Sequence, residues 1–221
     1  MKPLLLCLGL LTLLPPLAAQ PQAPIRIRLQ ALTLGDSEIE GLLYHDGREM
    51  QPLHAPVSHF HFPVEYEGPN PITLFVRREN PAEGETPYQP VTQIALPESA
   101  DAAVLLLSRQ GGQLRGNVVP LREEGFPLGS LMMLNVSGRE VHLRLGEELH
   151  RLAAGRTQFI RPALRERGVL PMIYRFADDP ENESLVSSGW FYHPERRYFV
   201  LVLDNQGQVG MRSITWFPPQ D

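Results

Sequence analysis

The chain has 221 residues, 25 acidic against 20 basic, and a formal net charge of −5. Its charges are dispersed, which argues against nucleic-acid binding because neutralising phosphates requires a basic face. The only cysteine and lysine are Cys7 and Lys2, so the chain after residue 19 has no disulfide, thiolate metal site or Schiff-base lysine. The 22 prolines are about twice the usual ~5% and disfavour helices.

The N-terminus has the three-part layout of a secretory signal peptide. Lys2 supplies the positive start, residues 4–14 form a leucine-rich run, and the small residues Ala18 and Ala19 follow. The apolar run of about 11 residues is shorter than the ~18 that cross a bilayer as a helix. We predict a signal peptide over residues 1–19, a disordered lead-in over 20–24, no membrane span in the mature chain, and export to the periplasm or beyond.

Short strands separated by turns follow in chain order. Residues 25–34 (IRIRLQALTL) alternate apolar and polar side chains, which is typical of a strand with one buried face. Asp46-Gly47 is a strong hairpin signal. Similar patterns predict further strands over 39–44, 50–53, 58–66, 72–76 and 91–96.

The chain repeats itself. Residues 104–121 (VLLLSRQGGQLRGNVVPL) and residues 200–217 (VLVLDNQGQVGMRSITWF) each place a Gln-Gly turn between two apolar runs, with an offset of 96 residues. Earlier in the chain the offset is 99, which aligns Gly47 with Gly146 and Phe75 with Tyr174. The ordered agreement of glycine, proline and apolar positions predicts a duplicated unit.

Each unit has room for six or seven short strands in roughly 90 residues, the size of an immunoglobulin-like sandwich. The predicted fold is therefore all-β, with two tandem immunoglobulin-like antiparallel β-sandwich domains. We place them at residues 25–122 and 128–218, joined by the short charged segment REEGFPLG, residues 122–129.

One pattern suggests a metal site. His59, His61 and Glu65 lie on one face of the predicted strand over 58–66, and such convergence suits a divalent ion. The spacing resembles the first cupin motif, although its flanking glycines are missing and Met132 stands where the second motif would have a histidine. The resemblance implies a metal-dependent cupin-like enzyme that uses these three residues. The alternative is a solvent-facing strand with two histidines, and we expect no cofactor.

A second pattern suggests a ligand site. In SGWFYH, residues 188–193, alternation places Trp190 and Tyr192 on the same side of a strand. Exposed aromatic side chains stack on sugar rings or anchor protein partners, so a carbohydrate-binding module centred on Trp190 and Tyr192 is one hypothesis. The competing interpretation is that both side chains are part of a sandwich core.

Residues 104–203 resemble secreted bacterial proteins with tandem β-sandwich domains. The segments FPLGSLMMLNVSGREVHLRLGEELHRLAAGRTQFIRP and RRYFVLVL carry the resemblance, which implies the architecture and no particular activity. The leading hypothesis is a non-catalytic exported protein that acts in binding or in organising the cell envelope, with a protein or glycan partner.

Overall fold

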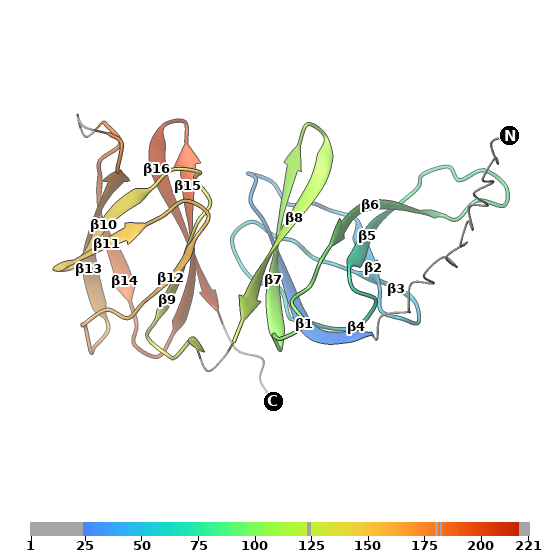
Figure 1. Ribbon diagram of the computed structural model, residues 1–221, viewed down its shortest axis with the longest axis horizontal. Coiled ribbons are helices and arrows are strands. Elements are labelled where there is room, and N and C mark those ends of the chain that lie inside the picture. The colour runs from blue at the N-terminus through green and yellow to red at the C-terminus, as the bar shows by residue number, and fades with distance from the viewer. Residues whose placement is uncertain (1–23, 123–124, 180, 182, 217–221) are drawn as a thin grey trace, which may run out of the picture.

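The structure is a computed structural model that describes residues 24–122, 125–179, 181 and 183–216. The predicted signal peptide, nearly all of the lead-in and residues 123–124 of the predicted linker lie outside this part. The described residues form an all-β protein of two β-sandwiches (Figure 1). The fold class is thus confirmed, and the immunoglobulin-like character of each sandwich stays a prediction.

The first sandwich has eight strands in two four-stranded sheets. Sheet A has the order β4-β1-β7-β8, and sheet B the order β3-β2-β5-β6. The strands are β1 (Ile25–Thr33), β2 (Leu42–His45), β3 (Met50–Pro52), β4 (Val64–Gly68), β5 (Ile72–Arg77), β6 (Tyr88–Ile94), β7 (Ala102–Gln110) and β8 (Gln113–Leu121).

The second sandwich has the same number of strands and the same connectivity. Sheet C has the order β12-β9-β15-β16, and sheet D the order β11-β10-β13-β14. The strands are β9 (Leu131–Asn135), β10 (Val141–Leu145), β11 (Glu148–Leu152), β12 (Thr157–Ile160), β13 (Gly168–Phe176), β14 (Val186–Tyr192), β15 (Arg197–Asn205) and β16 (Gln208–Trp216).

The two sandwiches correspond strand by strand, including their one parallel pairing each. β1 pairs with β7 in parallel, and β9 pairs with β15 in the same way, whereas the other pairings are antiparallel. The repeat predicted from the sequence is therefore a repeat of topology. Each unit holds eight strands rather than the six or seven expected.

The predicted alignment of the two hairpins was wrong by one residue. The β7–β8 turn is Gly111-Gly112 and the β15–β16 turn is Gln206-Gly207, all four with positive φ. This is the conformation of the two-residue type I′ turn that fits the twist of a hairpin. Gly111 therefore corresponds to Gln206, an offset of 95 residues rather than 96.

A similar slip affects β5 and β13. Phe75 pairs with Leu43 of β2, and Arg175 pairs with His142 of β10. Phe75 therefore corresponds to Arg175 and not to Tyr174. Because side chains alternate between the two faces of a strand, this slip exchanges a core position for a surface one.

Each sandwich encloses its own apolar core. In the first, Leu29, Leu74 and Leu105 are buried between sheets A and B; in the second, Leu143 and Val200 are buried between sheets C and D. Burying a side chain of this size contributes roughly 1.5–3 kcal/mol. These inward positions account for the alternating apolar pattern of the sequence.

A third apolar cluster joins the two sandwiches through the outer faces of sheets A and C. In β7, Leu105 is buried in the core of the first sandwich and the adjacent Leu106 in this interface. In β15, Val200 is buried in the core of the second sandwich and Leu201 in the interface. The sheets therefore stack in the order B, A, C and D along the long axis (Figure 1). The uninterrupted apolar runs of these strands reflect burial on both faces.

The interface uses the same positions of both units. The corresponding pairs are Leu32 and Leu134, Val104 and Phe199, Leu106 and Leu201, Val119 and Ile214, and Leu121 and Trp216, and every one of these side chains is buried. A buried polar contact departs from this equivalence: the Trp216 indole N–H donates to Oε1 of Gln30 at 2.7 Å. The positions that correspond to Gln30 and Trp216, Met132 and Leu121, are both apolar.

Candidate binding surface

The structure does not assemble the predicted metal site. His59 and His61 lie in the irregular segment before β4, which begins only at Val64, after Pro63. The His61 ring stacks on His54, with ring centroids 4.3 Å apart, and the His61 carbonyl accepts a hydrogen bond from Gln30 at 2.9 Å. In the part of the chain that the structure describes, no three metal-ligating side chains gather in one group.

The predicted aromatic site belongs largely to the second core. Tyr192 is buried, and its hydroxyl donates to the Gly129 carbonyl at 2.9 Å. Trp190 is half-buried against the same core, with its ring edge-on to Tyr198 at 5.2 Å. Burial raises the pKa of Tyr192 and Tyr198. The core interpretation therefore fits both residues, and the aromatic side chain left exposed in β14 is Phe191.

A different surface has the properties of a binding site: the outer face of sheet D. Three strands place a row of basic side chains across it, because Arg151 of β11 pairs with His142 of β10 and His142 pairs with Arg175 of β13. Directly opposed side chains on one face of a sheet have Cβ atoms about 4.5–5.5 Å apart, so the three side chains are close neighbours. The next row is Leu149, Arg144 and Ile173.

Two of these arginines have no partner of their own. Within the described residues, Arg144 and Arg151 make no hydrogen bond or ion pair. Arg175 donates to the carbonyls of Phe176 and Asp179, and the imidazole Nε2 of His142 lies 3.2 Å from a carboxylate oxygen of Glu140. The surface thus offers two unengaged guanidinium groups. Two acids lie beside the row: Glu140 next to His142, and Asp179, whose carboxylate interacts with Arg175.

Side chains of β10, β11 and β13, together with Leu185, line an open groove of about 430 Å³ on this face. Its floor is formed by β10 and β13, and Leu149 and Leu185 stand on opposite sides of it. Leu149 is 80% exposed and Leu185 48% exposed. A volume in this range is typical of ligand sites, which combine apolar walls with a few placed polar groups.

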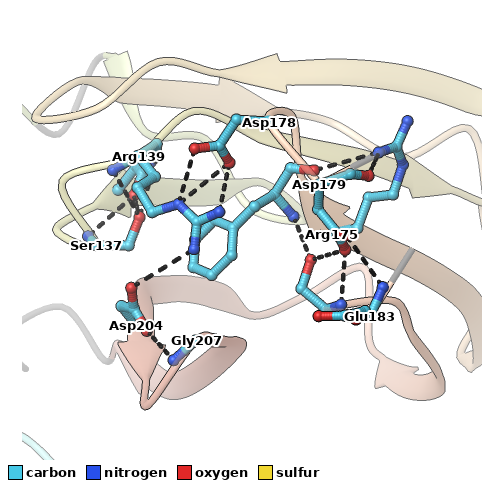
Figure 2. A network of polar contacts seen from close by, with 11 residues as sticks. Ser137, Arg139, Arg175, Asp178, Asp179, Glu183, Asp204 and Gly207 are labelled. Atoms are coloured by element: carbon cyan, nitrogen blue, oxygen red, sulfur yellow. Dashed lines mark hydrogen bonds and ion pairs between the residues drawn. The ribbon is translucent and has the colours of Figure 1, made fainter. Parts of the chain in front are cut away.

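The loop that carries Leu185 is fixed by a buried carboxylate (Figure 2). Asp179 accepts hydrogen bonds from the Glu183 amide, at 3.1 Å, and from the amide and hydroxyl of Ser184, each at 2.6 Å. These bonds, the one from the Ser184 hydroxyl above all, lower the pKa of Asp179. The rim of the groove is therefore held by the fold before any ligand arrives.

The acidic cluster beside this loop is structural. Arg139 lies over the Phe176 ring, 3.7 Å from its centroid, and its guanidinium pairs with Asp178 and approaches Asp204 at 3.9 Å (Figure 2). The hydrogen bond from Arg139 lowers the pKa of Asp178. Asp178 and Asp204 both contact Arg139, so the cluster links the β9–β10 connection to the β13–β14 connection and to the end of β15.

The far end of the same face is apolar. Val169 of β13 and Phe191 of β14 are cross-strand neighbours, 66% and 59% exposed. Arg175 and Val169 are six residues apart on β13, which is about 20 Å at ~3.3 Å per residue. The outer face of sheet D therefore changes from cationic to apolar along its strands.

The corresponding positions in the first sandwich are uncharged. Pro52, Leu43 and Phe75 of sheet B occupy the places of Arg151, His142 and Arg175. Overall charge differs in the same direction: residues 25–122 hold 12 acidic and 8 basic side chains, and residues 128–218 hold 10 and 11. Sequence reasoning missed this surface, although the alternation of His142 and Arg144 in VHLRL was a visible signal.

No protein-family model matches the chain, and a search of curated proteins finds no significant match. Within the described residues, no helix has the length and apolar character needed to cross a membrane.

Proposed function

We propose that the protein is a non-catalytic, exported binding protein of the cell envelope, and that the outer face of sheet D is its binding surface. The observation that carries the proposal is the pair of unengaged arginines, Arg144 and Arg151, beside the exposed Leu149 on a rigid sheet. Interfaces characteristically combine arginine with exposed apolar anchors.

The architecture supports this role. The apolar interface between sheets A and C fixes the two sandwiches against each other, so the sheet D face is presented at one end of an elongated body (Figure 1). A surface on a rigid sheet needs little reordering when a partner binds, which favours affinity. The first sandwich then acts as a spacer or carries a separate contact on sheet B.

The test is capture of envelope components by the immobilised full chain. We expect a component that is retained by the wild type and lost with the double variant Arg144→Glu/Arg151→Glu. The matched control is Arg109→Glu/Arg115→Glu, which makes the same change in charge on the exposed β7–β8 hairpin of the first sandwich. Equal retention by both double variants would contradict the proposal, and recovery of the chain in the cytoplasm would contradict export.

A further inference from the structure

We infer that the groove on sheet D binds an acidic, extended polypeptide segment of a partner protein, with its carboxylates at the arginines of the groove and apolar side chains toward Val169 and Phe191. This inference rests on the proposed function and specifies its ligand. Charge complementarity is the first argument. Arg151 and Arg175 flank His142 in one row and Arg144 lies in the next, so three guanidinium groups attract an anion to this face.

The chemistry of the cations favours carboxylates. A guanidinium is a planar fork of N–H donors that pairs with a carboxylate through two parallel hydrogen bonds. Arg144 and Arg151 both have their donors unengaged within the described part of the chain. They lie on neighbouring strands and in adjacent rows, so acidic side chains close together in a sequence can reach both.

The shape of the site favours a chain over a bilayer. Arg144 is exposed and lies between Leu149 and Ile173 in the lining of the groove. A hollowed surface offers less contact to a flat bilayer than to a narrow chain. A narrow polypeptide strand fits into the groove. An extended peptide of six or seven residues is long enough to span the roughly 20 Å from Arg175 to Val169.

The apolar side chains favour a peptide over an anionic glycan. The face has four exposed apolar side chains, Leu149, Leu185, Val169 and Phe191. A hydrophilic uronate polymer would leave them exposed to water. A peptide with acidic residues at one end and valine, leucine or phenylalanine at the other matches both halves of the face. Burying such side chains adds affinity that does not depend on salt.

The experiment is selection of peptides by the full chain. A display library of random octapeptides is panned against the wild type, against Arg144→Glu/Arg151→Glu and against the control Arg109→Glu/Arg115→Glu. We expect the wild type and the control to enrich peptides with clustered Asp or Glu next to apolar residues, and the sheet D variant not to. An enriched peptide, measured by fluorescence anisotropy, should bind the sheet D variant at least tenfold more weakly, and Leu149→Ser should weaken it several-fold.

Two further arms separate the possible failures. Vesicles containing phosphatidylglycerol and soluble polygalacturonate are tested against the same three proteins, whose folding is checked by circular dichroism. Enrichment without acidic bias, or equal affinity for all three proteins, would overturn the peptide inference. If the vesicles or the polyuronate bind in an arginine-dependent manner while no acidic peptide does, the inference fails and the binding function of the surface stands.

Discussion

The two sandwiches have the same topology and differ in what they show to solvent. At positions related by the repeat, sheet D presents Arg151, His142 and Arg175, whereas sheet B presents Pro52, Leu43 and Phe75. The positions that face the cores and the interdomain interface are apolar in both units. The comparison teaches that inward positions maintain the shared fold, while the outward positions of sheets B and D are free to differ in function.

The largest effects are expected where the two units are alike. Leu106→Ala and Leu201→Ala truncate corresponding side chains in the interface, each 0–1% exposed. We expect each to lower the free energy of unfolding by about 2–5 kcal/mol, as large-to-alanine changes in a core do. Urea unfolding measures this, with Leu105→Ala, one residue away in the first core, as the reference. A loss below about 0.5 kcal/mol, typical of surface positions, would show that the sandwiches do not depend on each other.

The next prediction concerns the buried contact between Trp216 and Gln30, which has no counterpart at the corresponding positions of the repeat. Gln30→Leu removes the acceptor of the buried Trp216 indole N–H, and leaving such a donor unpaired costs about 1–3 kcal/mol. Met132→Leu, at the corresponding position of the second unit, keeps the volume and should cost less, below about 1.5 kcal/mol. Chemical unfolding followed by tryptophan fluorescence compares the two. Equal losses would mean that the hydrogen bond does not contribute.

A third prediction compares the loops that follow β5 and β13. The first has the exposed ion pair Arg78–Glu85, at 2.6 Å, and the second has the buried carboxylate of Asp179. The pKa of Asp179 is lowered in the folded state, so the stability it contributes is present above the unfolded value of about 3.9 and is lost as the pH falls through the folded value.

We therefore expect stability to fall less steeply in acid for Asp179→Asn than for the wild type, with a lower stability at pH 7. Thermal unfolding between pH 7 and pH 2 measures both effects. Glu85→Gln should change the pH profile little, because exposed ion pairs contribute about 0–1 kcal/mol. Parallel profiles for Asp179→Asn and the wild type would show that this carboxylate does not hold the loop.

The smallest effect on stability is expected where the two units differ most. Arg144→Glu/Arg151→Glu replaces two exposed side chains without partners in the described structure, so the free energy of unfolding should stay within about 0.5 kcal/mol of the wild type. Differential scanning calorimetry checks this. A loss of more than 1 kcal/mol would mean that the arginines support the fold, which would weaken the case for a ligand.

The sequence allowed the fold class and the duplication to be predicted, because proline spacing, period-two alternation and hairpin turns are local signals. It did not give the register. The runs around Leu105 and Val200 are apolar at consecutive positions, so alternation could not distinguish an offset of 96 from 95. These uninterrupted apolar runs also indicated the interdomain interface, because a strand buried on one face alone would alternate apolar and polar residues.

The candidate site could not be predicted because it depends on pairing between strands. His142 and Arg151 lie on two consecutive strands, Arg175 lies further along the chain, and the three meet only through the register of these strands. The histidine pattern failed for a related reason: Pro63 delays the start of β4, so the assumed alternation of His59, His61 and Glu65 does not exist. Trp190 and Tyr192 fit the core alternative because the inner face of β14 is covered by the sandwich.

The interface built from matching positions of both units has a consequence for how this architecture arises. A contact in which each partner offers the same patch is the geometry of a two-fold homodimer. A single unit with this sheet face would expose a broad apolar surface and would associate with its twin. Joining the twins in one polypeptide makes the association independent of concentration, and it permits each half to acquire its own outward chemistry, which an assembly of identical subunits cannot do.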